Sequence, residues 1–352
     1  MIFIFLLLFI ILVLFLQQWS LDDSLDSVEG DFWPSENVIE PEEIFQITVR
    51  LKNQKRFPLY YVKVEIPFAK GLKIDSKMRR VKENHVIHGY TVTLSTWIKA
   101  KEQVLLPIQV FGVQRGRYVL IPPTVSLGDF LGLKDHGKNL EQFREIVIAP
   151  KEMTSPEVEQ LLGRFLGDFS VRRFLYEDPI LTLGYREYTG REPMKMIAWK
   201  QSAQRQQTLM VKEYDYTVEP SISVLVNVET SGDFSNEKKE LLEKCFSLAR
   251  SVCSQLESKG IPYDFYTNAQ MAGNTDNIYE VNEGLGTRHF TKVLELLGRS
   301  MYVSSFSYVK LLELADSASK PEQGKIVITP NDDVCSAVFS NQQLFILKAN
   351  LL

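Results

Sequence analysis

The stretch FQITVRL, residues 45–51, alternates strictly between apolar and polar side chains. Because successive side chains of a β-strand point to opposite faces, this alternation places all four apolar residues on one face. The same period of two recurs in residues 62–66 and 92–94. These segments therefore predict β-strands that each bury one face.

More short strands are expected after this stretch, at residues 104–111, 118–121 and 145–148. Residues 52–58 and 67–71 interrupt the alternation and have the composition of turns. Several short alternating strands separated by turns are typical of a β-sandwich. We therefore predict an immunoglobulin-like β-sandwich domain over residues 20–150.

The N-terminus, MIFIFLLLFIILVLFL at residues 1–16, contains no charged or polar side chain. As a helix it would span roughly 24 Å, slightly less than a hydrocarbon core of about 30 Å. Trp19 follows, a residue that favours the membrane interface. A cleaved signal peptide is the alternative, but it would need a basic start and a small-residue cleavage site. We interpret residues 1–19 as a single-pass anchor in the cell membrane. Its orientation is not determined, because no Lys or Arg flanks the segment on either side.

The net charge and the cysteine content argue against several classes of function. The chain has 352 residues, enough for two modest domains, and a net charge of −4. Nucleic-acid-binding proteins usually carry a basic excess, so we expect no nucleic-acid partner. The three cysteines, Cys245, Cys253 and Cys335, form no C-x-x-C motif, which argues against a disulfide framework or a zinc site. Unpaired cysteines fit a reducing compartment, and we expect the soluble part in the cytoplasm.

Residues 151–183 are expected to hold a connecting helix and a linker. Apolar residues recur at helical spacing, at positions 158, 161, 162, 165 and 166. Thr154 or Ser155 would cap this helix, and Pro156 suits its first turn.

The pattern changes to α/β in residues 218–352. Residues 222–226 and 325–329 indicate buried strands, and residues 236–258 indicate a helix with one apolar stripe, ended by Gly260. Further strands are expected at residues 263–266 and 344–347, and further helices at residues 287–297 and 308–315. Alternating strands and helices predict a parallel sheet covered by helices.

Between these regions, residues 184–214 read GYREYTGREPMKMIAWKQSAQRQQTLMVKEY. This stretch resembles the signature of the bacterial family called domain of unknown function 58. The matching residues are Arg186-Glu187-Tyr188, Gly190, Ile197, Trp199-Lys200, Ser202-Ala203, Leu209, Val211 and Lys212-Glu213-Tyr214. Residues 115–118 and 129–133 resemble motifs that end the family's sandwich domain. Arg191 and Ala198 stand where the family has acidic residues.

The resemblance implies a membrane-anchored β-sandwich, the signature segment at residues 184–217, and a von Willebrand factor A-like, Rossmann-like α/β domain at residues 218–352. Family members are often encoded beside MoxR-type AAA+ ATPases, so such an ATPase is the implied protein partner. The usual family member has two membrane helices, whereas this chain shows one such segment.

Domains of the von Willebrand factor A class can bind Mg²⁺ through an Asp-x-Ser-x-Ser loop, because carboxylate and hydroxyl oxygens suit a hard ion. The matching positions here read NVETS, residues 227–231. An Asn replaces the leading Asp, and Glu229 replaces the first Ser. Glu229, Ser231 and Asp332 would be the ligands of a degenerate site. The alternative is that the carboxylates are solvated loop residues, and we expect no cofactor.

The signature segment is rich in basic residues around one tryptophan, namely Arg186, Arg191, Lys195, Trp199, Lys200, Arg205 and Lys212. One interpretation is a basic surface that binds an acidic protein partner, with Trp199 at its centre. The other, which we favour for Trp199, is that this ring and Tyr188 are buried against the α/β domain, while Arg186 and Glu187 form ion pairs that fix the angle between the domains.

Motifs of enzyme chemistry are absent from the sequence. It has no phosphate-binding Gly-x-x-x-x-Gly-Lys loop, no His-Glu-x-x-His and no Gly-x-Ser-x-Gly. The four histidines are scattered, at positions 85, 88, 136 and 289. We therefore expect a membrane-anchored interaction or scaffold protein rather than an enzyme, with no small-molecule substrate. A metal-dependent adhesion-type module is the alternative.

Overall fold

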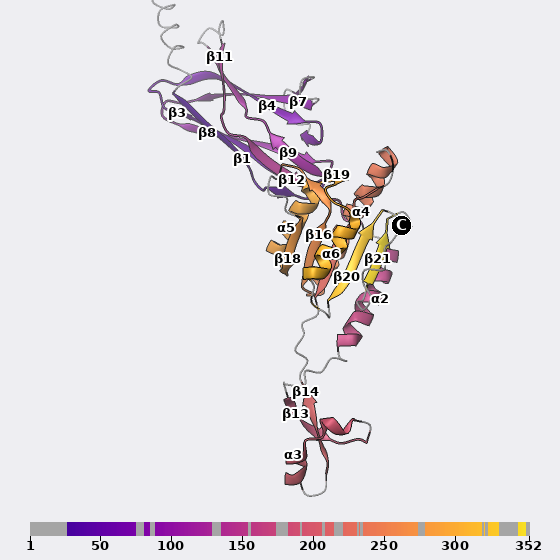
Figure 1. Ribbon diagram of the computed structural model, residues 1–352. Coiled ribbons are helices and arrows are strands. Elements are labelled where there is room, and N and C mark those ends of the chain that lie inside the picture. The colour runs from indigo at the N-terminus through magenta and orange to yellow at the C-terminus, as the bar shows by residue number, and fades with distance from the viewer. Residues whose placement is uncertain are drawn as a thin grey trace, which may run out of the picture. The chain divides into compact units, whose positions relative to one another are not determined.

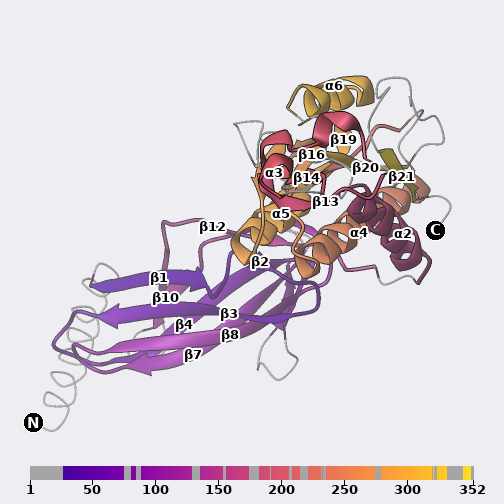
Figure 2. The same ribbon diagram turned by 90° about the horizontal axis from the view of Figure 1, so that it is seen from below.

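The computed structural model describes residues 27–74, 81–84, 89–128, 135–153, 156–173, 182–190, 192–205, 208–214, 221–230, 232, 235–273, 279–318, 320, 323–330 and 344–349. The chain forms two compact units, whose elements are labelled in Figure 1 and Figure 2. The first unit consists of Met1–Lys151, Met271–Asn277 and Thr291–Met301, and the second of Glu152–Gln270, Ile278–Phe290 and Tyr302–Leu352.

A β-sandwich makes up most of the first unit, which confirms that prediction. One sheet has the strand order β1-β3-β8-β5, the other the order β11-β10-β4-β7-β6, and a small third sheet the order β2-β12-β9. The strands are β1 (Val28–Pro34), β2 (Val38–Ile39), β3 (Ile44–Asn53), β4 (Leu59–Ala69), β5 (Leu72–Ile74), β6 (Val81–Asn84), β7 (Gly89–Ile98), β8 (Gln103–Gly112), β9 (Gly116–Leu120), β10 (Thr124–Gly128), β11 (Asp135–Asn139) and β12 (Arg144–Ile148).

The alternation in β3 and β4 builds the sandwich core. All four apolar residues of the 45–51 stretch are buried, and they share one hydrophobic cluster with the apolar residues of β4 and β7. Thr48 is also buried, and it accepts a hydrogen bond of 2.8 Å from the side chain of Gln46. The expected turn at residues 67–71 was placed too early, because β4 continues to Ala69. Pro67 fits this strand because it lies beyond the β10 pairing, which ends at Glu65.

The second unit contains a five-stranded sheet of order β18-β16-β15-β20-β21. Its strands are β15 (Ile222–Val226), β16 (Tyr263–Thr267), β18 (Glu280–Gly284), β20 (Gly324–Thr329) and β21 (Leu344–Lys348), and β17 (Ala269–Met271) pairs separately with β19 (Ser300–Ser304). The sheet is mixed rather than parallel throughout, because β18 pairs with β16 in the antiparallel direction. The polar sequence of β18 gives no apolar period, so this edge strand was not expected.

The four helices that the sequence predicted are present as α2 (Pro156–Arg173), α4 (Asn236–Ser258), α5 (Thr287–Arg299) and α6 (Tyr308–Ala318). In Figure 2, α6 lies on one side of the sheet and α4 on the other. Four residues of α6 pack on Leu225, Tyr266 and Val327 of the sheet. The expected connecting helix α2 contacts the sheet directly, since Phe165 stacks on Phe345 of β21 at 5.0 Å.

The buried face of α4 contains the two cysteines that the structure describes. Cys245 and Cys253 are fully buried and free of disulfides. Burial raises the pKa of Cys245 to about 12 and also raises the pKa of Cys253. Both thiols therefore stay protonated and behave as small hydrophobic residues, as their place on the apolar stripe predicts.

The first unit also includes the end of α5. Arg115 donates from its guanidinium to the carbonyl oxygens of Leu297 at 2.7 Å and Ser300 at 2.6 Å, which satisfies carbonyls at the end of the helix. Glu145 accepts from Arg117 at 2.7 Å and from Arg299 at 2.5 Å. Burial alone would raise the pKa of Glu145, but these two arginines lower it. The motif at residues 115–118 therefore ties the sandwich to this helix end.

Several sequence-based expectations lie outside the described residues. They are the anchor at residues 1–19, the motif at residues 129–133, Arg191, Ser231, Asp332 and Cys335. Within the described ranges, no helix combines the length and the apolar character that a bilayer crossing requires.

Candidate interaction site

The signature segment folds into a small module of the second unit. It comprises strand β13 (Thr182–Glu187), a 3-10 turn η1 (Met194–Met196), the short helix α3 (Trp199–Gln204) and strand β14 (Met210–Tyr214). β13 and β14 pair in the antiparallel direction, and an isolated bridge joins Ile197 to Val211. The segment is therefore a β-hairpin, and the signature residues lie on both its strands and its long connection.

The Ile-x-Trp-Lys-x-Ser pattern has a structural cause. Ile197, Ala198, Met210 and Val211 are buried and form the interior of the module. The hydroxyl of Ser202 donates to the carbonyl of Ala198 at 3.0 Å and accepts from the amide of Met210 at 2.8 Å. A single hydroxyl thus joins α3 to β14, because it satisfies backbone groups on both elements.

Glu192 holds the turn after β13. Its carboxylate accepts from the hydroxyl of Thr189 at 2.8 Å, from the Thr189 amide at 3.1 Å and from Arg186 at 2.5 Å. The hydrogen bonds from Thr189 and then Arg186 lower the pKa of Glu192 to about 2. Arg186 therefore forms an ion pair, as the sequence predicted, with Glu192 of the same module. Gly190 has φ +87°, which only glycine adopts without strain.

Trp199 lies on the surface of the module. Its side chain is 60% exposed, so the expectation that it would be buried is wrong. Ala198 and Ser202, one turn apart, supply the contacts with β14, and Trp199 projects from a different side of α3. Met194 is also strongly exposed, and so, to a lesser degree, are Tyr185 and Leu209.

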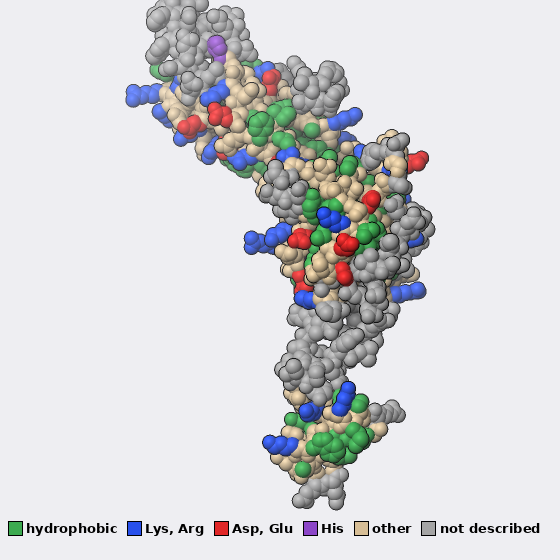
Figure 3. Space-filling view, in the orientation of Figure 1, with side chains coloured by type: hydrophobic (Ala, Val, Ile, Leu, Met, Phe, Trp, Pro, Cys, Tyr) green, Lys and Arg blue, Asp and Glu red, His purple; other side chains and the backbone are tan. Residues whose placement is uncertain are grey.

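Basic side chains surround these apolar groups, as the visible face of the module shows in Figure 3. Lys195, Lys200 and Arg205 are exposed, and Lys212 is half-buried in β14 opposite Tyr185. Residues 182–214 contain six basic and three acidic residues, a net charge of +3 in a chain whose total is −4. The structure thus brings together five of the six predicted basic residues, and Arg191 lies outside the described residues.

Of the second predicted site, the structure describes Glu229, and the polar residues beside it lie at the carboxyl ends of β15, β16 and β20. Asn227 is buried, and its side-chain oxygen accepts from Asn268 at 2.8 Å and from the amide of Glu229 at 3.0 Å. Its side-chain nitrogen donates to the hydroxyl of Thr329 at 3.1 Å. Asn268 in turn accepts from the amide of Val228 at 2.8 Å. This buried network is neutral and its members hydrogen-bond to one another, so Asn227 acts as a structural link between three strands.

Glu229, the central residue of the predicted metal loop, has a structural partner. Its carboxylate accepts from the amide of Tyr308 at 2.6 Å, at the N-terminus of α6. A carboxylate is favourable there because the first amides of a helix have no partner within the helix. Among the described residues, no group of three metal-binding side chains comes together.

Sequence reasoning missed Asn268 and Thr329. Thr329 is the last residue of β20, and Asn268 directly follows β16 as Asn227 directly follows β15. That shared position after neighbouring strands was the available signal, because the carboxyl ends of parallel strands meet at one edge of a sheet.

Comparisons with known proteins add little to this geometry. No protein-family model and no curated protein matches the chain. Among solved structures, the CARDB domain of a Pyrococcus furiosus protein in complex with di-metal ions is similar at 11% identity and a TM-score of 0.22, over 34% of this chain and 91% of that domain. The Pseudomonas fluorescens alkylpurine DNA glycosylase AlkC, bound to DNA with an abasic site analogue, is similar at 12% identity and a TM-score of 0.20, over 35% of this chain and 30% of AlkC.

Proposed function

We propose that this chain is a membrane-anchored interaction or scaffold protein, and that the signature module binds an acidic surface of a protein partner. The observation that carries the proposal is the exposure of Trp199 among Lys195, Lys200 and Arg205. Tryptophan and arginine are enriched among the residues that dominate binding energy at protein interfaces. An acidic partner follows from the excess of basic over acidic residues in the module.

The internal contacts of the module support a role in binding a protein partner. Ser202, Glu192 and the buried residues 197, 198, 210 and 211 hold the backbone on which the exposed side chains stand. A preorganised surface loses less conformational entropy when a partner binds. The likeness of residues 184–214 to the domain of unknown function 58 makes a MoxR-type AAA+ ATPase the candidate partner. The contacts of Glu229 and Asn227 give no support to the alternative, a metal-dependent adhesion module.

Site-specific photocrosslinking in the native cell tests the proposal. A photoreactive amino acid at position 199 should crosslink to one protein, and the same amino acid at the exposed position Phe143 serves as a control. The double variant Lys195→Glu, Lys200→Glu should reduce the crosslink at least tenfold, because charge reversal repels an acidic partner. Lys195→Gln, Lys200→Gln should give an intermediate yield. A crosslink at position 199 no stronger than that at position 143 would refute the proposal.

A further inference from the structure

One end of the β-sandwich is formed by two loops that are hydrogen-bonded to each other. Residues 54–58 join β3 to β4, and residues 99–102 join β7 to β8. The side-chain amide of Asn53, which is fully buried, donates to the carbonyls of Phe57 at 2.8 Å and Lys99 at 3.0 Å. The amide of Lys101 donates to the carbonyl of Lys55 at 3.1 Å. We call this end, residues 52–61 and 97–102, the sandwich tip.

The sandwich tip exposes large aromatic side chains. Phe57 is 59% exposed, Tyr60 63% and Trp97 57%. The register of β4 and β7 shifts between Leu59 and Val62, so that Tyr60 and Tyr61 together stand opposite Trp97. Exposed aromatic residues gathered at one place on a domain mark an interaction surface.

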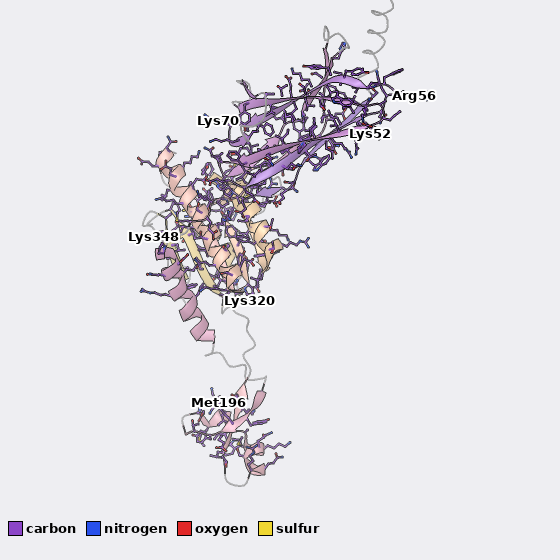
Figure 4. The ribbon with its side chains drawn as sticks, turned by 180° about the vertical axis from the view of Figure 1, so that it is seen from behind. Lys52, Arg56, Lys70, Met196, Lys320 and Lys348 are labelled. Carbon is purple, nitrogen blue, oxygen red and sulfur yellow. The ribbon has the colours of Figure 1, made fainter. Side chains whose placement is uncertain are left out.

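Basic residues flank these rings. Lys52, Lys55, Arg56, Lys99 and Lys101 belong to the tip, and Figure 4 shows Lys52 and Arg56 at this end of the sandwich and Lys70 at the opposite end of β4. The ammonium of Lys99 lies 5.8 Å from the centre of the Trp97 ring. Two of the basic residues form ion pairs. The ammonium of Lys52 lies 3.8 Å from the carboxylate of Glu29, and the ammonium of Lys99 lies 3.7 Å from the carboxylate of Glu102. The tip and Glu29 together therefore carry an excess of three positive charges.

The chain enters the sandwich at this same end. The amide of Gln54 donates to the carbonyl of Ser27 at 2.9 Å, and Val28 pairs with Asn53. Only residues 20–26 separate this point from Trp19, the last residue of the expected anchor. Seven residues reach at most about 25 Å when fully extended, so an anchored chain keeps the tip close to the bilayer surface. Three of these residues are acidic, Asp22, Asp23 and Asp26, and they oppose attraction to an anionic surface.

We propose that the sandwich tip rests on the anionic surface of the bilayer, with Phe57, Tyr60 and Trp97 in the headgroup region and the five basic residues against lipid phosphates. Aromatic rings favour the membrane interface, and basic residues within a Debye length of anionic lipids are attracted to them. The inference rests on the anchor that belongs to the proposed function. It adds a second contact, which would restrict how the sandwich turns on its tether.

Collision accessibility of a nitroxide label tests this contact in the full chain. A Cys335→Ser background leaves only the two buried cysteines. One label is placed at Phe57→Cys, and a matched control label at Lys70→Cys, beyond the other end of β4. In nanodiscs of phosphatidylglycerol and phosphatidylcholine, the label at position 57 should collide more with lipid-soluble oxygen than with an aqueous nickel chelate. The label at position 70 should show the reverse.

Two variants separate the contributions to the contact. Trp97→Ala should raise the nickel-to-oxygen collision ratio at position 57 severalfold, whereas Ile44→Ala, at the far end of β3, should leave the ratio unchanged. Lys55→Glu, Arg56→Glu should raise the ratio in the anionic discs, and discs of phosphatidylcholine alone should raise it for the parent chain. An unchanged thermal midpoint shows that each variant is folded.

The outcomes distinguish this inference from the proposed function. A chain that enters the discs with position 57 as water-exposed as position 70 overturns the inference and leaves the anchor standing. A chain that does not enter the discs overturns the anchor and the inference together. Equal accessibility in anionic and neutral discs overturns the role of the basic residues.

Discussion

At the scale of single residues, Asn227 shows how one buried side-chain amide can join three strands. Its amide oxygen accepts two hydrogen bonds and its amide nitrogen donates one, all at 2.8–3.1 Å. An aspartate would keep the two acceptor contacts but lose the donor. It would also place a buried negative charge beside Glu229. The neutral amide is therefore the side chain that this network requires.

We expect Asn227→Asp to lower the free energy of unfolding by about 1–3 kcal/mol at neutral pH, because a buried polar group loses its partner and gains a charge. Urea unfolding of the second unit, followed by the fluorescence of its tyrosines and tryptophan, measures the change. Glu229→Gln is the matched control, since it keeps an oxygen for the amide of Tyr308 and should cost less. Stabilisation of the parent chain by millimolar Mg²⁺ would contradict a purely structural network.

Ala198 is one of the positions at which the chain departs from the signature that residues 184–214 resemble. It is the residue before α3, and it makes no side-chain hydrogen bond to the helix. Aspartate at such a position commonly accepts from the first amides of a helix. Ala198 gives no such cap, and Ser202 attaches the helix to β14 through the hydrogen bonds of its side chain.

At the scale of elements, the central sheet carries a polar row across three strands. Ser223 pairs with Asp264 on one side and with Lys325 on the other, so the three residues lie on the same face. All three are buried, and Lys325 contacts Asp316 of α6 at 2.7 Å. One carboxylate oxygen of Asp264 accepts from Gln323 at 2.9 Å, whereas the other has no hydrogen bond of good geometry.

Burial raises the pKa of Asp264, and the side chains of Ser223 and Gln323 offset this only in part. The folded state therefore holds the Asp264 proton more tightly than the unfolded state does. The resulting stability is present below the ordinary pKa of 3.8 and is lost as the pH rises through the folded value.

We expect Asp264→Asn to be more stable than the parent chain at pH 7, by about 1–3 kcal/mol, and equally stable at pH 3. Thermal unfolding at both pH values measures the difference. Asp316→Asn is the control and should lower the stability at pH 7, because it removes the ion pair of the buried Lys325. Lower stability of Asp264→Asn at pH 7 would show that its attraction to Lys325 exceeds the cost of burial.

At the scale of the whole molecule, the proposed membrane anchor is combined with two surfaces that contain both aromatic and basic side chains. One is the sandwich tip beside the chain entry, and the other is the signature module of residues 182–214. A chain that holds the bilayer by one surface and a protein by the other would act as a scaffold. The side of the membrane decides which partners it can reach.

We expect a compartment-sensitive reporter fused after Leu352 to report the cytoplasm, because the proposed ATPase partner and the unpaired cysteines belong to that compartment. Deletion of residues 1–19 should move the chain from the membrane fraction to the soluble fraction. An external reporter signal would exclude direct contact with a cytoplasmic ATPase, and an unchanged membrane fraction after the deletion would exclude the anchor.

The sequence alone determined many of the elements and their buried faces. The helix expected at residues 236–258 is α4 with the same bounds, and the alternation of residues 45–51 gives the buried face of β3. These features are local, because a period of 3.6 or 2 residues is set by the backbone geometry of each element. The edge strand β18 has no such period, and the sequence did not reveal it.

Only the tertiary structure decided which residues meet. Arg115 contacts the carbonyl of Leu297, 182 residues away, and Asn227 contacts Asn268, 41 residues away. The exposure of Trp199 also contradicted a sequence-based expectation, and the sequence did not identify Glu192 as a partner of Arg186. Such contacts depend on how the chain closes on itself, and no local pattern encodes the residue that a side chain meets after closure.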